Sequence, residues 1–380
     1  MSSKVICHID LNTFFVRCEE IKNPSLEGKA VAIGSEGRSG IVSTCSYKAR
    51  EYGVRSGMPM FKAKELCPNL IILPGDFKLI NKKSKEFFNY VKRYTKLIEI
   101  ASCDECYADF TEAIKLNKNP IKFFEDFQIG LFKETKLRCS IGIAPTKFLA
   151  KMGSDMKKPM GITIIRKKDA VNMLSPLPVG DFFGIGKKTA PRLINAGIST
   201  IGDLYSRIKS QDEDVKMMMG KFFYVIADMV EGNSSDQLDM DPWDPKSIGN
   251  STTLPEDTND LYDIKESLSS LSKEVSDRCI KENKLGNTIQ IVIKDTDFKV
   301  KNKSCKLQAP TNDYKVIYDT ACKLYEKNYA GIVVRLVGVT LQNLIDPRDV
   351  VIQMTFDDYE MYEEKSQTKL LIEELNRKLS

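Results

Sequence analysis

Apolar and polar residues near the N-terminus first alternate and then give way to an apolar run, in KVICHIDLNTFF at residues 4–15. This pattern predicts a buried strand that begins almost at once and ends in a turn or at the start of a helix. The Gly-rich stretch that follows, up to Pro59, contains two short β-type runs, AVAIG and GIVSTC, and a short helix around Tyr47–Tyr52. We expect it to form a small subdomain inserted after the first strand.

Helical and strand patterns alternate over the next part of the chain. The expected elements are an amphipathic helix and a strand within 78–102, a helix at 119–136, a strand at 137–144 and a helix at 145–161. Pro145 opens the last of these helices, and the Lys-Pro-x-Gly sequence closes it. From Lys168 to Asn233 the pattern is helical throughout, in short segments.

A polar stretch rich in Pro and Asp, SSDQLDMDPWDPKS, marks the clearest domain boundary in the chain. The patterns beyond it predict a helix at about 256–284, paired strands at 287–308, a helix at about 311–328 and a strand at 333–344. This order of elements is typical of a compact α+β domain. At 380 residues the chain is also too long for one core, and about two to four domains are expected.

Composition narrows the class of protein. The 42% hydrophobic and 29% charged content describes a soluble globular protein. No apolar run approaches the ~20 residues that span a bilayer, and the N-terminus lacks the apolar core and cleavage site of a secretory signal. We therefore expect a cytoplasmic protein whose ten scattered cysteines are reduced. The single histidine, His8, excludes a His-rich metal site.

The formal charge of +5 is unevenly distributed. Residues 346–380 contribute −4, which leaves +9 on residues 1–345. A basic body with an acidic tail suits a protein that binds a polyanion, although a surplus of lysine alone is weak evidence.

The stretch ASCDECYADF at 101–110 offers two kinds of chemistry. Cys103 and Cys106 have C-x-x-C spacing, but alternate strand positions would point them to opposite faces. A structural zinc site also needs two further ligands, and the sequence has no second C-x-x-C and no histidine pair. We therefore expect the cysteines to be packing residues and the acids between them to carry the chemistry.

Asp104 and Glu105 lie at the end of one β-type run, and Asp10 ends the first strand. Two buried strands that each end in a carboxylate give an oxygen-rich site of the kind Mg²⁺ prefers. Two such ions ~3.5–4 Å apart can activate an attacking oxygen and stabilise a leaving one in phosphoryl transfer. From the acids alone, the alternative that they are ordinary turn residues at strand ends stays open.

HIDLNTFFVRCEE and SCDECYADF together resemble the two metal-binding motifs of the Y family of DNA polymerases. The resemblance extends through STCSYKAREYGVRSGMP, SIGIAPTKFLAKMGSDMKKPMGI and FGIGKKTAPRLINAGISTIGDL to RLVGVTL. It covers residues 4–342 in the expected order, and the combination is far more specific than any one motif.

The resemblance implies an α+β multidomain fold, a right-hand polymerase with a ferredoxin-like palm, small fingers, a helix-hairpin-helix thumb and an α+β little finger domain. The implied boundaries are a palm at 1–22 and 76–167, fingers at 23–75, a thumb at 168–235, a linker at 236–247, a little finger at 248–345 and an acidic tail at 346–380.

The resemblance also assigns the catalytic metals, two Mg²⁺ ions for which Mn²⁺ can substitute. Asp10 and Asp104 are expected to bridge both ions, and Glu105 to join the site that aligns the primer 3′-hydroxyl. The backbone carbonyl of Leu11 is expected to complete the shell of the nucleotide-bound ion.

Further residues are implied to contact the incoming deoxynucleoside triphosphate. Phe15 matches the steric gate, whose ring excludes a ribose 2′-hydroxyl by clash, while Phe14 is expected in the core. The expected nucleotide-binding residues are Thr44, Tyr47 and Arg50, on one face of a short helix, and Lys158. Hydroxyls with a guanidinium fork can hold a triphosphate. Ile41 and Ser43 are expected to lie over the nascent base pair.

DNA contacts are expected in two places. The FGIGKK sequence reads as the turn of a helix-hairpin-helix, in which amides around Gly184, Gly186 and Lys187, at the start of the next helix, bind a backbone phosphate without reading sequence. Lysines then cluster on the paired strands beyond the linker, and alternating ones could face a duplex or simply a solvated sheet face. They are Lys294, Lys299, Lys301, Lys303 and Lys306.

Two features bear on the branch of the family. Asn12 stands where many members have a second Asp, and with CEE and DECYADFT this favours the UmuC-type branch over the polymerase IV-type branch. Near the end, QMTFDDYE, with Gln353 and Phe356, lies where bacterial relatives carry a motif that binds the sliding clamp, and a plain acidic tail is the alternative.

The sequence is thus interpreted as a bacterial, cytoplasmic and nucleoid-associated DNA polymerase of low fidelity, for translesion synthesis on damaged templates. Its expected partners are primer-template DNA, the incoming nucleotide and the sliding clamp, and it is expected to be a monomer with no membrane association. The alternative is a noncatalytic DNA-binding relative that acts as an accessory factor.

Overall fold

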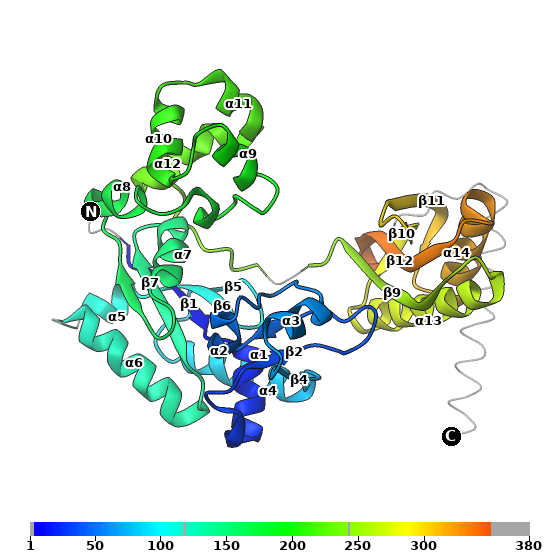
Figure 1. Ribbon diagram of the computed structural model, residues 1–380, viewed down its shortest axis with the longest axis horizontal. Coiled ribbons are helices and arrows are strands. Elements are labelled where there is room, and N and C mark those ends of the chain that lie inside the picture. Colours follow the sequence, from blue (N-terminus) through cyan, green and yellow to red (C-terminus); the bar gives the residue numbers. More distant parts are fainter. Residues whose placement is uncertain (1–3, 116, 118, 242–243, 351–380) are drawn as a thin grey trace. The chain divides into compact units, whose positions relative to one another are not determined.

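The computed structural model describes residues 4–115, 117, 119–241 and 244–350. The chain divides into two compact units, Met1–Asp241 and Pro242–Ser380, and the division falls inside the predicted linker (Figure 1). Gln353 and Phe356, predicted to bind a clamp, lie outside the described residues. No helix among the described residues is long and apolar enough to cross a membrane.

A five-stranded sheet forms the centre of the first unit. Its strands, in spatial order, are β5 (Ile98–Ile100), β6 (Glu105–Asp109), β1 (Ile6–Leu11), β7 (Cys139–Ala144) and β8 (Ile162–Ile164). The first strand of the sequence is thus central, antiparallel to β6 on one side and to β7 on the other. The mixed α+β architecture predicted from the sequence is confirmed.

Helices cover both faces of this sheet, and strand alternation assigns each residue of β1 to one of them. Cys7, Ile9 and Leu11 enter an apolar core shared with α4 (Phe77–Val91) and α6 (Pro120–Thr135), while α1 (Phe14–Lys22) contributes Phe14 and Cys18. The other residues of β1, including His8 and Asp10, face α7 (Lys147–Met156). The α7 face therefore receives the polar side chains. The short α5 (Thr111–Lys115) follows β6.

Gly142 allows α7 to lie unusually close to the sheet. A Cβ atom at this position would meet the carbonyl oxygen of Ala150 at 1.9 Å and the amide nitrogen of Ser154 at 2.4 Å. Gly142 is also the cross-strand neighbour of His8. Only glycine permits this approach of the two backbones, so the residue sets the distance between α7 and the polar side chains of β1.

The Gly-rich stretch forms the predicted inserted subdomain, with its own small core. Its sheet has the order β3 (Thr44–Cys45), β2 (Val31–Ile33), β4 (Ile71–Leu73). The helical segments are η1 (Pro24–Leu26), α2 (Tyr47–Glu51) and α3 (Met60–Leu66). One expectation is wrong here. Thr44 lies on strand β3 and not on the short helix, because Ser46 caps that helix and starts it at Tyr47.

Short helices follow to the end of the first unit, as predicted. They are η2 (Lys167–Asp169), α8 (Ala170–Leu174), η3 (Val179–Asp181), α9 (Ala190–Asn195), α10 (Ile201–Lys209), α11 (Glu213–Met219), η4 (Gly220–Phe222) and α12 (Phe223–Glu231). Their core is continuous with residues of α7 such as Phe148 and Leu149, so this helical region packs on the α7 side of the sheet.

Within its described residues, 244–350, the second unit is a four-stranded antiparallel sheet with two α-helices. Its elements are β9 (Ser247–Thr258), α13 (Leu261–Lys281), β10 (Leu285–Asp295), β11 (Val300–Thr311), α14 (Tyr314–Tyr329), β12 (Val334–Ile345) and η5 (Pro347–Asp349), and its spatial order is β11-β10-β12-β9. Sequence patterns missed β9 and placed a linker and a helix start there. The strand is mostly polar and exposed, so it carries little apolar signal.

Candidate active site

Two of the predicted carboxylates face each other across neighbouring strands. Asp10 lies one residue before the end of β1, and Glu105 opens β6. The two are direct cross-strand partners in the antiparallel pair, and the amide of Leu11 donates to the carbonyl of Asp104 at 2.9 Å. The pairing register therefore brings Asp10 and the Asp104-Glu105 pair to one place, although they are far apart in the sequence.

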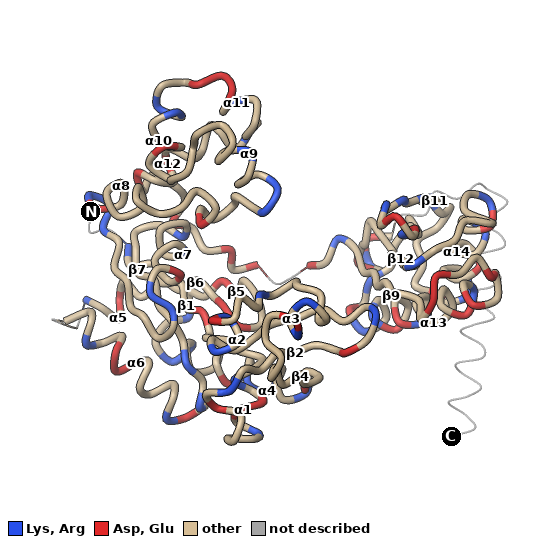
Figure 2. The backbone as a smooth tube through the Cα atoms, viewed as in Figure 1, with Lys and Arg blue, Asp and Glu red and all other residues tan. Residues whose placement is uncertain are grey.

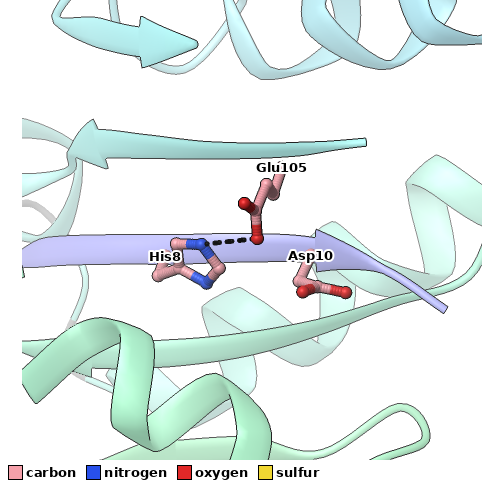
Figure 3. A group of neighbouring side chains, drawn as sticks. All are labelled: His8, Asp10 and Glu105. Atoms are coloured by element: carbon pink, nitrogen blue, oxygen red, sulfur yellow. Dashed lines mark ion pairs between the residues drawn. The ribbon is translucent and has the colours of Figure 1, made fainter. Parts of the chain in front are cut away.

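His8 joins these acids on the same face of β1 (Figure 3). One potential ligand atom from each of His8, Asp10 and Glu105 lies within 4.8 Å of the others. His8 Nε2 is 3.3 Å from Glu105 Oε2. The His8 imidazole, with help from Lys151 and against the effect of burial, lowers the pKa of Glu105 to about 2. Glu105 is therefore ionised at neutral pH.

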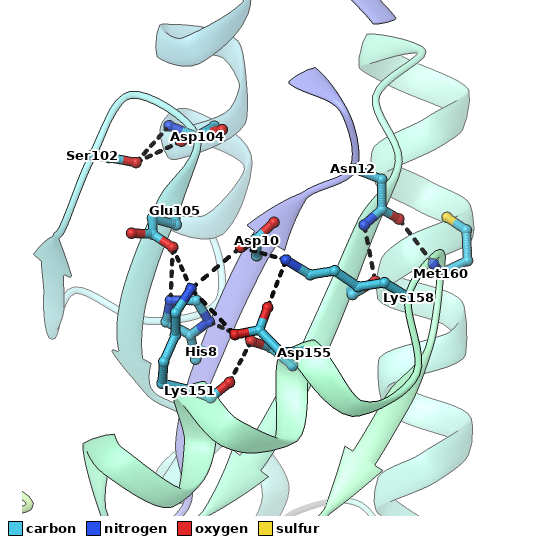
Figure 4. A network of polar contacts seen from close by, with 12 residues as sticks. His8, Asp10, Asn12, Ser102, Asp104, Glu105, Lys151, Asp155, Lys158 and Met160 are labelled. Carbon is cyan, nitrogen blue, oxygen red and sulfur yellow. Dashed lines mark hydrogen bonds and ion pairs between the residues drawn. The ribbon is translucent and has the colours of Figure 1, made fainter. Parts of the chain in front are cut away.

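Asp104 lies next to this group but outside it. Its Oδ1 accepts a hydrogen bond from the Ser102 hydroxyl at 2.5 Å (Figure 4). Burial raises the pKa of the Asp104 carboxyl, and the nearby charges of Asp10 and Glu105 raise it further, while the Ser102 bond partly opposes them. The structure thus collects all three predicted carboxylates, with two different electrostatic environments for the adjacent Asp104 and Glu105.

Two lysines from the α7 region neutralise the acids (Figure 4). Lys151 Nζ lies 2.8 Å from Glu105 Oε2 and 3.5 Å from Asp10 Oδ2. Lys158 Nζ lies 2.8 Å from Asp10 Oδ2 and 2.8 Å from Asp155 Oδ1. Burial works against both ammonium charges, but the surrounding carboxylates raise the pKa of each lysine. The carboxylates therefore hold positive charge at this position even without a metal.

These oxygen ligands fit a hard divalent cation. Asp10 and Glu105 are half-buried and converge from two rigid strands, and Asp104 adds a third carboxylate beside them. Carboxylate oxygens that leave room for water and phosphate ligands are the set that Mg²⁺ prefers. The site is thus suited to divalent cations as a class.

Part of the predicted nucleotide-binding set gathers beside Asp10. The guanidinium of Arg50 lies over the ring of Tyr47, 5.1 Å from its centroid. Burial raises the pKa of Tyr47, and the charges of Arg50 and Lys158 partly offset that effect. Thr44 lies three residues before Tyr47, at the start of β3.

A cavity of about 310 Å³ borders this set. Asn12, Thr13, Tyr47 and Met160 contribute to its wall. Asn12 itself is buried and joins three segments, because its amide donates to Ser140 Oγ at 2.9 Å and its Oδ1 accepts from the Met160 amide at 2.8 Å. The Asn that departs from the common pattern of the family thus connects β1 to β7 and to the loop that carries Lys158.

The two phenylalanines that follow β1 differ in environment. Phe14 is 2% exposed and belongs to the core, whereas Phe15 is half-buried and lies edge-on to Phe77, with ring centroids 6.2 Å apart. Phe77 is 64% exposed. Ile41 and Ser43 are both exposed on the inserted subdomain. Phe15, Ile41 and Ser43 are thus accessible to a ligand, as their predicted roles require.

The predicted phosphate-binding turn has a glycine where the backbone requires one. Gly184 has a φ of +107°, and a Cβ there would lie 2.7 Å from the Phe222 ring, whereas Gly186 faces open space. The expected helix start is displaced, since Lys187 precedes α9 by a turn and the helix begins only at Ala190. The amides near Gly186 therefore belong to a turn and not to the first turn of a helix.

The five lysines of the second unit do not form one strip. Lys301 and Lys303 pair with Ile293 and Ile291, which face the helices. Lys294 and Lys306 lie on the opposite face by the same register, and Lys299 is in the connecting turn. The pairing register thus divides the lysines between the two faces of the sheet, and the expectation that alternating ones face a duplex stays a prediction. Acidic and basic residues are interspersed over both units (Figure 2).

The cysteines of the C-x-x-C sequence take no part in a metal site within the described residues. Cys106 lies in β6 and is fully buried, whereas Cys103 precedes the strand and is exposed, so the two cysteines have different environments. All ten cysteines are free thiols. Cys103 is not the packing residue that we expected, because it precedes β6 in an irregular bend.

Sequence reasoning missed four residues of this site: His8, Lys151, Ser154 and Asp155. Lys151, Ser154 and Asp155 have the i, i+3 and i+4 spacing that places side chains on one helical face, and this signal was available in KMGSDMKKP. His8 lies two residues before Asp10 and so on the same face of the strand.

Comparison with known proteins supports a common origin for the whole chain. The sequence model of the impB/mucB/samB family matches residues 9–155, and the model of that family's C-terminal domain matches residues 245–355. The curated relatives include "DNA polymerase IV" of Oceanobacillus iheyensis, which is 37% identical, with 99% of this chain and 89% of the relative covered. "DNA polymerase IV 1" of Bacillus subtilis is 36% identical, with 99% and 91% covered. These names do not support the preference for the UmuC-type branch.

Solved structures give the same result. A Y-family DNA polymerase chimera of Dbh and Dpo4 is similar with a TM-score of 0.78 and 28% identity, and 90% of this chain and 99% of that chain are covered. An insertion ternary complex of Dbh DNA polymerase is similar with a TM-score of 0.61, 28% identity and the same coverage.

Proposed function

We propose a function for this chain on the premise that it belongs to the impB/mucB/samB family, the Y-family DNA polymerases. It is a DNA-directed DNA polymerase of translesion synthesis. No observation on the described residues favours the alternative of a noncatalytic accessory factor.

The observation that carries the proposal is the cross-strand pair of Asp10 and Glu105, with Asp104 adjacent. We assign Asp10 and Asp104 to the binding of two divalent cations, with Glu105 and the carbonyl of Leu11 completing the set. Two such ions, Mg²⁺ or Mn²⁺, would supply activation of the primer 3′-oxygen and stabilisation of the leaving pyrophosphate.

Lys151 and Lys158 hold the carboxylates together before substrate arrives. Lys158 reaches both Asp10 and Asp155, and its charge acts on the Tyr47 hydroxyl together with that of Arg50. A nucleotide triphosphate in this place offers Lys158 a stronger anionic partner than Asp10. We infer that Lys158 transfers from the carboxylate to the phosphates together with Tyr47, Arg50 and Thr44, and so leaves Asp10 free to bind a cation.

The remaining assignments follow the position of each residue around this centre. Phe15, supported by Phe77, excludes the ribose 2′-hydroxyl, and Ile41 and Ser43 contact the nascent base pair. The first sheet is the palm, the inserted subdomain the fingers, the helical region the thumb and the second unit the little finger, with the boundaries given above. The turn with Gly184, Gly186 and Lys187 binds a phosphate of the DNA.

The substrates are primer-template DNA and a deoxynucleoside triphosphate. DNA contact by the second unit would use Lys294 and Lys306 on one sheet face, and Lys299, Lys301 and Lys303 at the β11 edge. A monomer in the bacterial cytoplasm at the nucleoid, with Gln353 and Phe356 bound to a sliding clamp, completes the proposal.

Primer extension with purified protein tests the metal assignment. Substitution of a residue that only supports a metal ligand commonly lowers activity about 10–100-fold. Asp104→Ala removes a proposed ligand itself, so we expect a larger loss of activity. Cys103→Ser is the matched control, because the residue is adjacent, exposed and outside the site. Extension by Asp104→Ala at the rate of the control would refute the assignment of Asp104.

A further inference from the structure

His8 is buried beneath the catalytic acids without an assigned role. It is the single histidine of the chain and is 0% exposed, in the centre of β1. A buried imidazole of this kind is costly unless both ring nitrogens have partners. The partners of its two nitrogens therefore indicate what the residue does.

The ring spans the distance from α7 to Glu105. Nδ1 lies 2.7 Å from Ser154 Oγ, and Nε2 lies 3.3 Å from Glu105 Oε2. Tyr107 packs against the ring, with centroids 4.7 Å apart, and so restricts its rotation. His8 thus connects a rigid helix to a carboxylate of the active site (Figures 3 and 4).

With a neutral ring, one arrangement of hydrogens gives both ring nitrogens a partner, and it gives up the contact of Ser154 with the Lys151 carbonyl. The Ser154 hydroxyl has a single hydrogen, which it can donate either to Nδ1 or to the carbonyl of Lys151 at 2.8 Å. If Nδ1 accepts that hydrogen, a neutral imidazole carries its own hydrogen on Nε2 and donates it to Glu105. Nε2 makes no hydrogen bond of good geometry at 3.3 Å, so a small movement of the carboxylate would complete the bond.

Both contacts on Glu105 fall on the same oxygen. Lys151 Nζ approaches Oε2 at 2.8 Å, and His8 approaches the same atom. Lys151 is also held by Asp10 and Asp155, and its flexible stem allows it to move when a cation enters. His8 cannot move in this way, because it is fixed in a central strand between β6 and β7.

We propose that His8 is a positioning residue, which holds Oε2 of Glu105 so that the other oxygen, Oε1, faces the cation and the primer 3′-hydroxyl, while Ser154 sets the orientation of the ring. The inference rests on the proposed catalytic role of Glu105. Hydrogen-bond partners of metal-binding carboxylates act in this manner, and their loss costs about 10–100-fold in activity or metal affinity.

Four variants test the proposal in single-nucleotide insertion assays. His8→Gln places an amide N–H near the position of Nε2, His8→Asn can reach only the Ser154 side, and His8→Phe keeps the ring without a donor. We expect kcat to fall about 10–100-fold in His8→Phe and His8→Asn, with little change in KM for the nucleotide, and to recover in His8→Gln. Thr163→Val is the control, since Thr163 Oγ1 in the same sheet is, like His8 Nε2, a buried polar atom without a hydrogen-bond partner.

Two measurements separate positioning from folding and from the function itself. Mn²⁺ binding, followed by electron paramagnetic resonance of the free ion, should weaken in His8→Phe and not in His8→Gln, and all variants should melt at similar temperatures. The proposal would be overturned if His8→Phe had the same kcat as the wild type, or if kcat fell equally in His8→Gln and His8→Phe. If the wild type itself extends no primer, the proposed function fails, while the Mn²⁺ titration still tests His8.

Discussion

The two large sheets of this protein are both antiparallel around their central strands and both covered by helices, but their covered faces differ in chemistry. In the second unit, the face under α13 and α14 is apolar, with Ile291 and Val339 at its centre. In the first unit, the face under α7 contains His8, Asp10, Glu105 and Lys151. Buried ion pairs rarely add stability over apolar packing. The difference therefore indicates which sheet is selected for stability and which for chemistry.

The largest expected effect is a loss of activity, caused by a substitution on the charged sheet face under α7. Asp10→Asn removes the carboxylate that both lysines contact, and we expect primer extension to fall by more than about 100-fold, beyond the effect of altering a neighbour of a metal ligand. Single-turnover insertion with saturating DNA and nucleotide measures it.

Asp109→Asn provides the control on the same sheet. Asp109 ends β6 and accepts a hydrogen bond from the Thr111 amide at 2.8 Å, as an ordinary turn residue does. Its activity should remain near that of the wild type. Similar losses in both variants would mean that Asp10 is also only a turn residue.

A substitution on the apolar sheet face of the second unit should instead lower the stability of that unit. Ile291 is 1% exposed, and Ile291→Ala is expected to cost about 2–5 kcal/mol in the free energy of unfolding of the second unit. Urea unfolding followed by circular dichroism measures this cost. Mn²⁺ binding by the first unit should be unchanged, and a loss of binding in Ile291→Ala would contradict the separation of roles between the sheets.

The smallest expected effect is on the pH dependence of folding stability, and it has opposite signs at the adjacent residues Asp104 and Glu105. Burial raises the pKa of Asp104, so its ionised form is disfavoured in the fold, and Asp104→Asn should stabilise the metal-free protein at pH 7. That gain should shrink as the pH falls through the raised pKa, because the wild-type carboxyl then becomes neutral too.

Glu105 should behave in the reverse manner. The pKa of Glu105 is lowered to about 2, chiefly by His8, so its ionised form stabilises the fold above the pKa of the unfolded chain. Glu105→Gln should destabilise the protein at pH 7, and the difference from wild type should vanish as the pH falls from about 4.5 towards 2. Unfolding in EDTA at several pH values tests both variants, and shifts of the same sign would contradict the two environments.

The same contrast explains which features were predictable from the sequence. Period-2 and helical patterns identified β1, β7 and α7, because their apolar residues face cores. The polar strand β9 gave no such signal. The division of the lysines between two sheet faces depends on strand register, and the contact of His8 with Ser154 depends on packing between distant segments. Neither can be predicted from local sequence patterns. Gly142, which permits the close approach of α7, became interpretable only with Ala150 opposite it.

The pairing of Asp10 with Glu105 also governs when the enzyme first becomes competent during its synthesis. Asp10 leaves the ribosome before its cross-strand partner on β6, and Lys158 follows later still. At ~5–20 residues per second, the interval between Asp10 and Lys158 is on the order of ten seconds. Nascent chains that end before Glu105 carry Asp10 without its cross-strand partner, so a translation product truncated there lacks the pair of acids on which the proposed centre depends.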